Sequence, residues 1–323
     1  MEEKQTFEQF FQTELVPALR PLEERRKGVV QKAMISCGAV VLAAVFIALF
    51  LLNQAGSILV LAFPAIIGIA ISVFIFKAMT SGYVRDFKNQ VVGPIVRYVG
   101  PQLTYRPESG ISEGQFQSSG IFHHSIDRYH CEDLVQGPVD KTRIAFSELH
   151  AEYKTETRDS KGHRQTHWHT IFKGLFFVAD FNKHFHGKTY ILPDTAEKMF
   201  GRFGQKLQGI GKSHGELVKL EDPVFEKEFA VYSSDQVEAR YILSPALMRR
   251  MLELRRKAGS NVYFSFCGGN VNIAISSNKD RFEPKLFNTV LDIELAREFV
   301  DDLQSAIGVV DELNLNTRIW TKE

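Results

Sequence analysis

The sequence predicts an α+β protein with two parts, a two-helix transmembrane hairpin and a cytoplasmic domain of antiparallel β-hairpins with inserted and C-terminal helices. Two uncharged apolar runs, each long enough to span a bilayer, lie close together near the start of the chain. Beyond about residue 110, apolar and polar residues alternate as they do in half-buried strands. Strand pairs joined by short turns are interrupted and followed by helical patterns, which indicates α+β rather than regular βαβ units.

The segments flanking the apolar runs are predicted to be helices. Residues 1–32 form an amphipathic cytoplasmic helix in this prediction, and residues 77–105 form a juxtamembrane helix. Two arrangements fit their narrow apolar stripes, namely helices lying on anionic lipid, or helices packed on each other or on the soluble domain. Acidic residues on the polar faces favour packing. The stripes are Phe7, Phe10, Phe11, Leu15 and Leu19 in the first segment, and Val84, Phe87, Val91, Ile95 and Val99 in the second.

The transmembrane hairpin is predicted over residues 33–76. Residues 33–52 and 57–76 are two runs without a charge, and a bilayer core about 30 Å thick needs about twenty helical residues. A buried helix of a soluble core would show a polar face or a charge over such lengths. The connector 53–56 is short enough for only a tight turn, so the two spans run antiparallel.

The charges around the hairpin predict its orientation. Lys and Arg side chains flank both outer ends of the hairpin, and the connector 53–56 has none. By the positive-inside rule, both termini lie in the cytoplasm. The flanking basic residues are Arg20, Arg25, Arg26, Lys27 and Lys32 before the hairpin, and Lys77, Arg85, Lys88 and Arg97 after it.

Composition excludes several classes of partner and site. The 39 Lys and Arg residues against 38 Asp and Glu give a formal charge of +1, so the basic excess that nucleic-acid binding needs is absent. Cys37, Cys131 and Cys267 are far apart and form no C-x-x-C pair. This excludes a disulfide scaffold and a cysteine-based zinc site.

The α+β domain is predicted over residues 106–323. Its clearest feature is a long β-hairpin over residues 147–181, with a turn signal at Asp159–Gly162. Whether the region is one domain or two lobes divided near residues 208–215 stays open. Further strands are predicted at 116–122, 188–192, 215–221, 229–234, 261–266 and 270–277, and helices at 193–207, 243–259 and 292–313.

The 147–181 hairpin carries the one candidate metal site. His167 and His169 point to the same side of an extended strand. If the hairpin closes at residues 160–161, Glu152 lies opposite His169 and Lys154 opposite His167. Two imidazoles and a carboxylate on one face could hold zinc or non-haem iron. A solvent-facing polar hairpin is the favoured alternative, because the spacing is no recognised ligand signature and Lys154 opposes a cation. No catalytic and no other cofactor-binding residue is predicted.

Several blocks of the sequence resemble DUF3137, a family of bacterial membrane proteins of unknown function. They are LVPALRPLEERRK, SSGIF, IAFSELHAEY, GLFFVADFNKHFHGKTYILPD and LEDPVFEKEFAVYSSDQVEARYILSPALM. The resemblance implies a multi-pass protein of the bacterial inner membrane with a cytoplasmic domain, and it implies no activity. Some members are similar in genomic setting to LemA-type membrane proteins, which implies a link to envelope function.

The leading hypothesis is a non-enzymatic protein in the lipid bilayer whose cytoplasmic domain binds a protein, a lipid head group or a small ligand. One alternative is a metal-dependent membrane-associated enzyme that uses the histidines of the 147–181 hairpin. Another is an oligomeric membrane scaffold, in which small residues allow close helix packing. These small residues are Gly38, Ala43, Ala44, Gly68 and Ala70.

Overall fold

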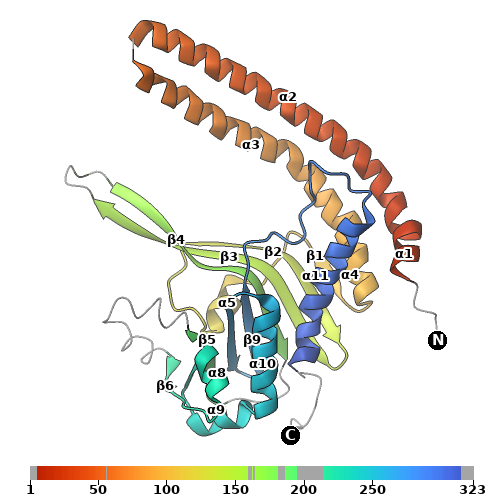
Figure 1. Ribbon diagram of the computed structural model, residues 1–323, viewed down its shortest axis with the longest axis vertical. Coiled ribbons are helices and arrows are strands. Elements are labelled where there is room, and N and C mark those ends of the chain that lie inside the picture. Colours follow the sequence, from red (N-terminus) through yellow and green to blue (C-terminus); the bar gives the residue numbers. More distant parts are fainter. Residues whose placement is uncertain are drawn as a thin grey trace. The chain divides into compact units, whose positions relative to one another are not determined.

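The computed structural model describes residues 6–55, 57–158, 162, 164–180, 186–194 and 214–313 (Figure 1). The chain divides into two compact units. Unit 1 comprises Met1–Ile95 and Phe282–Val300, and unit 2 comprises Val96–Arg281 and Asp301–Glu323. The predicted fold class is confirmed, because an apolar two-helix hairpin is joined to an antiparallel sheet with helices.

Unit 1 is helical and is built around two long helices. Thr6 starts the first helix with a capping box, since its hydroxyl accepts a hydrogen bond from the Gln9 amide and the Gln9 side chain accepts one from the Thr6 amide. The helices are α1 Phe7–Phe10, a π-helical turn Phe11–Leu15, α2 Val16–Ala55, a 3-10 turn Ile58–Leu61, α3 Ala62–Phe87, a π-helical turn Lys88–Val92 and α4 Gly93–Val99, which continues into unit 2 from Val96.

The hairpin consists of α2 and α3, which run antiparallel and side by side. The Cys37 thiol donates a hydrogen bond of 3.3 Å to the Ser72 carbonyl. A Cβ atom added to Gly68 would lie 2.8 Å from the Cβ of Ala44, so these small residues already serve close packing within the chain. Both helices are long and apolar enough to cross a membrane. Gly56 of the predicted turn lies outside the described residues.

The apolar stripes beside the hairpin are buried in the protein. Phe10, Phe11 and Leu15 are at most 3% exposed, and Phe87 and Val91 are 1% exposed. The packed arrangement that the sequence favours is therefore the one observed, rather than helices lying on lipid.

Unit 2 is built on one nine-stranded sheet in which every pair of neighbouring strands is antiparallel. The strand order is β1-β2-β3-β4-β9-β8-β5-β7-β6. The strands are β1 Thr104–Arg106, β2 Arg128–Val139, β3 Thr142–Arg158, β4 Arg164–Asp180, β5 Thr189–Pro193, β6 Glu216–Leu217, β7 Phe229–Ser233, β8 Val262–Cys267 and β9 Asn270–Ser276.

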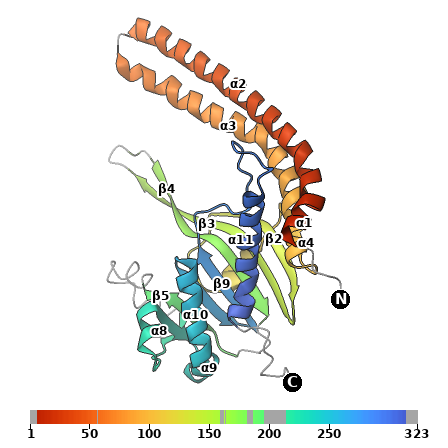
Figure 2. The ribbon, with the colours of Figure 1, turned by 45° about the vertical axis from the view of Figure 1, so that its right-hand side comes forward.

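In the described part of the chain, five helices accompany the sheet: α5 Glu113–Ser118, α8 Pro223–Glu228, α9 Gln236–Ile242, α10 Pro245–Ala258 and α11 Ile293–Glu312, the last of which begins in unit 1. Figures 1 and 2 show α10 against one face of the sheet and the β3–β4 arm projecting past the other strands. The predicted helices at 243–259 and 292–313 are confirmed.

One predicted strand is wrong, one predicted helix lies largely outside the described residues, and two short helices were not predicted. The strand expected at 116–122 is wrong, because the Ser112 hydroxyl caps α5 and Phe116 turns into the core. Pro193 ends β5, and most of the predicted helix 193–207 lies outside the described residues. The short helices α8 and α9 were not predicted; each begins at an Asp side chain that accepts two backbone hydrogen bonds.

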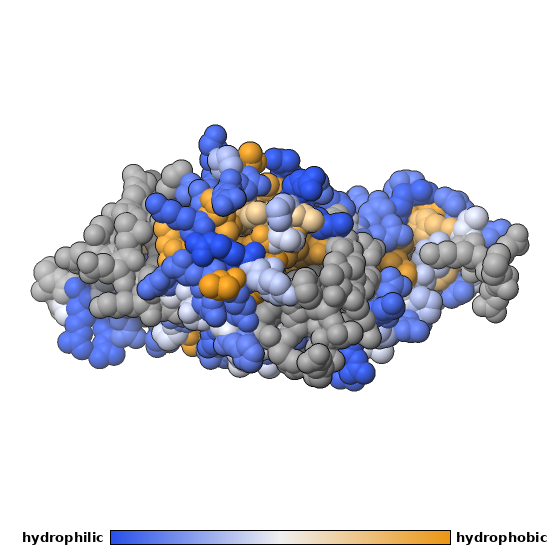
Figure 3. All heavy atoms as spheres, turned by 90° about the horizontal axis from the view of Figure 1, so that it is seen from below, coloured by the Kyte–Doolittle hydropathy of each residue, from blue (hydrophilic) through white to orange (hydrophobic). Residues whose placement is uncertain are grey.

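The core of unit 2 is aromatic. Phe116 meets Phe176 edge to face at 5.0 Å between ring centroids and also contacts Phe172. The surface is mixed, because on the face in Figure 3 hydrophobic side chains lie among hydrophilic ones. Val237 and Tyr241 on α9 are among the exposed apolar residues.

Candidate functional site

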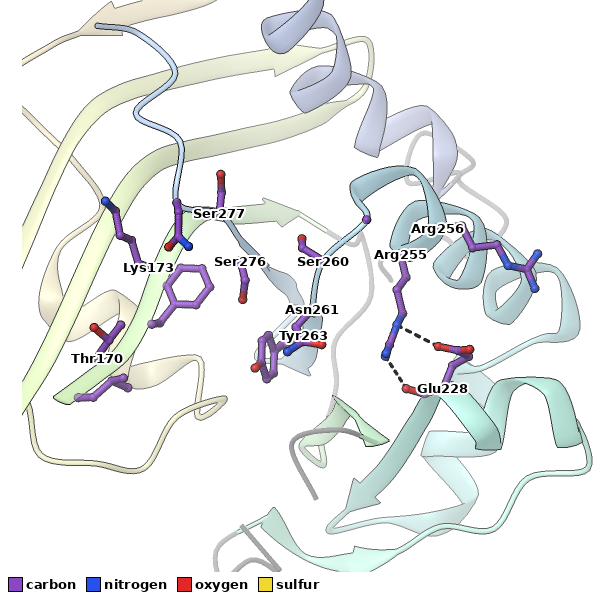
Figure 4. A pocket seen from close by; sticks show the side chains of 14 residues that line it. Thr170, Lys173, Glu228, Arg255, Arg256, Ser260, Asn261, Tyr263, Ser276 and Ser277 are labelled. Carbon is purple, nitrogen blue, oxygen red and sulfur yellow. Dashed lines mark hydrogen bonds and ion pairs between the residues drawn. The ribbon is translucent and has the colours of Figure 1, made fainter. Parts of the chain in front are cut away.

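Unit 2 contains an open hollow of about 780 Å³ where β4, β9 and the end of α10 meet (Figure 4). In Figure 4, Ser260, Asn261, Tyr263 and Ser276 lie in its middle. The lining consists of residues 170–173, 259–261 and 276–278, together with Glu228, Arg255, Arg256 and Tyr263. Hydroxyl, amide and cationic groups therefore share its surface with apolar side chains such as Ile171 and Phe172.

Local sequence signals place the two walls of the hollow. Ser244 and Pro245 begin α10, and Gly259 ends it in the left-handed conformation with φ +61°. On the other wall, Gly174 has φ +148°, and a Cβ there would lie 2.1 Å from the Ile275 carbonyl oxygen. The strands β4 and β9 thus approach closely at Gly174, and the hollow opens beyond that point.

Two of the cationic side chains that line the hollow, Arg255 and Lys173, form ion pairs with different acidic residues. The Arg255 Nε atom lies 3.0 Å from a Glu228 carboxylate oxygen, and its Nη1 donates a hydrogen bond to the Glu228 carbonyl. Lys173 pairs with Asp280 at 3.4 Å. In Figure 4, Lys173 and Arg256 stand on opposite sides of the hollow. The cations therefore line the rim, and neutral polar groups occupy the middle.

Two hydroxyls in the middle are partly desolvated. The Ser260 Oγ atom is buried and has no hydrogen-bond partner among the residues that the structure describes. Burial raises the pKa of the Tyr263 hydroxyl, while hydrogen bonds with Ser276 and Asn261 lower it in part. Tyr263 consequently stays protonated at neutral pH and can donate a hydrogen bond to a ligand.

The free edge of β4 continues from the hollow into the projecting arm. On the side of β9, pairing with β4 begins at Gly174 and Ser276, and the Ser277 amide adds one bond to the Lys173 carbonyl. Within the described part of the chain, no strand pairs with Arg164–Phe172 on that side. Residues 164–170 are all exposed. An unpaired edge of this length is a template for another extended chain.

The structure separates the three predicted metal ligands. His169 pairs with Tyr153, His167 with Thr155 and Glu152 with Thr170. The predicted register is one residue off, because His169 pairs with Tyr153 rather than with Glu152. A shift of one residue moves every side chain to the other face. His167 and His169 therefore share a face that Glu152 does not.

On this face, His169 contacts neutral side chains. His169 Nε2 lies 2.9 Å from the Thr155 hydroxyl, and the imidazole stacks on Tyr153 with centroids 4.9 Å apart. The His124 ring also stacks on Tyr153, with ring centroids 4.6 Å apart. Among the described residues, neither His167 nor His169 belongs to a group of three close metal-ligating side chains.

Glu152 belongs to a separate cluster. Its carboxylate lies 3.1 Å from the Arg128 guanidinium and 3.8 Å from His150 Nε2. The Arg128 guanidinium in turn lies 3.9 Å above the Trp168 ring. The Glu152 carboxylate is thus paired with Arg128, which also stacks on Trp168 of β4.

Sequence reasoning missed the hollow. Its walls come from segments up to about a hundred residues apart, such as Lys173 and Ser276, and no local pattern brings them together. Basic residues are common in the last turn of any helix, because they interact favourably with the helix dipole. Arg255 and Arg256 at the end of α10 therefore do not indicate a binding site in the sequence.

Comparison with known proteins bears on this part of the chain. No curated protein and no solved structure matches it. Residues 170–315 match the family described as "Protein of unknown function (DUF3137)". The matched segment contains every residue of the hollow and excludes Glu152, His167 and His169. Over residues 170–315 the predicted resemblance to DUF3137 is confirmed, because this part of the chain matches the model of that family.

Proposed function

We propose that the protein is a membrane-anchored binding protein whose α+β unit takes up an extended, acidic segment of a partner protein. The segment adds as a strand to the free edge of β4 and places side chains in the hollow. In this proposal the hairpin 33–76 spans the bacterial inner membrane, and both termini and unit 2 lie in the cytoplasm. The protein has no enzymatic role in it, and His167 and His169 act as polar side chains of the edge rather than as zinc or iron ligands.

The observation that carries the proposal is the edge Arg164–Phe172, with which no described strand pairs on the side of β9. A two-stranded ribbon exposed on both faces is marginally stable alone, and a third strand would satisfy its backbone N–H and C=O groups. Backbone pairing supplies the affinity in strand addition, while pockets beside the strand supply specificity. The hollow lies at the base of this edge, because Thr170 and Phe172 belong to both.

The basic residues around the edge of β4 favour an acidic partner segment. Strand β4 has no acidic residue before Asp180, whereas Arg164 and Lys173 stand at the two ends of the edge and two histidines lie between them. Arg255 and Arg256 add positive charge across the hollow. Arg164 also lies 3.7 Å from a Glu156 carboxylate oxygen. An acidic strand would therefore meet a cation at each end of the edge.

The same charges disfavour a second copy of the chain at this edge. Two β4 edges pairing antiparallel would bring basic and imidazole side chains against each other, which destabilises cross-strand pairs. Lys and Arg on an edge strand also protect natural sheets against such self-association. The partner is thus a different protein.

Fluorescence anisotropy with the full chain in detergent tests the proposal. The probe is a labelled alternating Val-Glu peptide of about eight residues, the length that the free edge accommodates. We expect saturable binding, and we expect a matched Val-Lys peptide to bind at least about ten-fold more weakly, because its charges oppose those of the edge.

Charge-reversal variants localise the binding. Arg164→Glu combined with Lys173→Glu should weaken Val-Glu binding about ten-fold, while Arg249→Glu on the exposed side of α10 should leave it unchanged. Equal binding of a thymidine oligonucleotide would show a general polyanion surface and would overturn the proposal. So would binding that the two edge reversals do not change.

A further inference from the structure

A β-turn in unit 1 presents an aromatic ring to the surroundings. The Asn288 amide donates a hydrogen bond of 3.1 Å to the Lys285 carbonyl, which closes the turn around Leu286 and Phe287. Phe287 at its tip is 70% exposed. A single exposed apolar residue is ordinary on a protein surface, whereas a ring held next to a larger exposed apolar surface marks a contact site.

The turn is fixed to α2 by buried polar contacts. The Arg26 Nη1 atom donates a hydrogen bond of 2.7 Å to the Leu286 carbonyl. Glu23 pairs with Arg26 and also accepts a hydrogen bond of 3.1 Å from the Val290 amide. Glu23 and Arg26 are 5% and 8% exposed, so this linkage is largely shielded from water. Phe287 is therefore held outward by the fold.

The ring lies at the level where the apolar runs end. Phe287 stacks on Phe76 with centroids 5.8 Å apart and an interplanar angle of 16°. Phe76 is the last residue of the second apolar run and precedes Lys77. The Cys37–Ser72 hydrogen bond aligns the two helices. Ala33 lies one turn before Cys37 in α2, and Phe76 lies one turn after Ser72 in the antiparallel α3, so these two residues stand side by side. Ala33 begins the first apolar run, and Phe76 ends the second.

Basic residues surround this level. Lys27 has a side chain that is 69% exposed, and Lys32 and Lys77 are exposed as well. An aromatic ring beside apolar helices and a collar of cations matches the acyl–headgroup boundary of an anionic bilayer. Figures 1 and 2 show the segment before α11 beside the lower part of the α2–α3 hairpin.

We propose that the turn 285–288 inserts Phe287 into the interfacial layer of the bilayer. A segment far from the two spans in sequence thus gives the protein a third apolar contact with lipid. This inference rests on the proposed insertion of the hairpin. The occupant is the lipid surface, because the exposed ring continues the apolar surface of α3 through Phe76.

Tryptophan fluorescence of the full chain in vesicles tests the inference. Trp168 and Trp320, the two native tryptophans, are replaced by Phe, and Phe287→Trp is introduced. The vesicles contain equal parts of phosphatidylcholine and phosphatidylglycerol, with bromine placed near the headgroup end of the acyl chains. We expect blue-shifted emission and a loss of about half of its intensity to bromine, because the interfacial layer is about 5–10 Å deep.

Two matched variants separate the possible outcomes. Phe46→Trp, at a position of the first span that is 74% exposed, should be quenched by bromine deep in the acyl chains. Gln12→Trp, exposed on the same helical stretch about 30 Å before Ala33, should not be quenched. Unquenched Phe46→Trp would contradict the membrane insertion itself. Quenched Phe46→Trp with unquenched, red-emitting Phe287→Trp would overturn this inference and leave the insertion standing.

Discussion

Two acidic side chains, Glu152 and Glu23, make contacts that the sequence does not reveal. Glu152 faces Arg128 and lies on the opposite face from His167 and His169, because the strands pair one residue away from the predicted register. In unit 1, the Glu23–Arg26 pair links α2 to a segment more than 250 residues later, at Leu286 and Val290. Neither role is visible from residue type, since an acid beside a base on a helix usually forms a solvated surface pair.

Glu23→Gln should destabilise the protein by about 3 kcal/mol, because it leaves the buried Arg26 without its counter-charge. The hydrogen bonds from Arg26 hold the pKa of Glu23 at about 2 instead of 4.5. A lowered pKa stabilises the fold fully above pH 4.5, and this contribution is lost as the pH falls toward 2. Thermal unfolding in detergent should therefore show a difference between the native protein and the variant that shrinks over this range.

The exposed neighbour supplies the control for Glu23. Glu24→Gln removes the same charge from the same helical turn without touching Arg26, and it should change stability by less than about 0.5 kcal/mol. A Glu23→Gln protein as stable as Glu24→Gln at neutral pH would show that the pair contributes nothing.

Whole elements are positioned by close backbone approach as much as by side chains. The long strand β4 changes neighbours at Gly174, where β9 begins to pair with it and the arm ends. Residues 164–170 are exposed, whereas residues 175–177 are buried in the sheet. The glycine therefore marks the border between the core sheet and the candidate binding edge.

Gly174→Ala should cost about 3 kcal/mol or more. Its φ of +148° is open to glycine only, and the added Cβ would lie 2.1 Å from the Ile275 carbonyl oxygen, a backbone atom that cannot move alone. The loss of β-sheet circular dichroism with temperature measures the effect. Gly114→Ala in α5 is the control, because nothing lies within 4 Å of its added Cβ. A small shift for Gly174→Ala, equal to that of the control, would contradict this account.

At the scale of the whole molecule, the two units bury their apolar residues differently. Unit 2 encloses aromatic rings such as Phe116 and Phe176 in a sheet-and-helix core. The hairpin of unit 1 instead exposes large apolar side chains, including Leu42, Phe46 and Phe74, each more than 70% exposed. Soluble proteins rarely expose an apolar surface of this extent, because its contact with water is unfavourable. We therefore propose that the membrane surrounds this part of the hairpin.

The proposed orientation predicts the result of reporter fusions. Alkaline phosphatase, active only outside the cytoplasm, should be active when inserted after Gln54 in the full chain. A green fluorescent protein at the C-terminus should fluoresce, because that end is cytoplasmic under the positive-inside rule. Replacing Arg25, Lys27 and Lys32 by Gln should lower the activity at Gln54 as orientation becomes mixed. An inactive phosphatase at Gln54 in a stably inserted protein would refute the orientation.

The sequence by itself determined the apolar hairpin, the α+β class and the helices at 243–259 and 292–313, because hydrophobic runs, periodicity and caps are local signals. Tertiary structure alone decided the register of the 147–181 hairpin, the hollow, and the attachment of the Phe287 turn to α2. Register depends on the geometry of one loop, and the hollow depends on where β9 leaves β4 at Gly174. Contacts between distant segments follow from the packing of the whole chain, and no short stretch of sequence carries them.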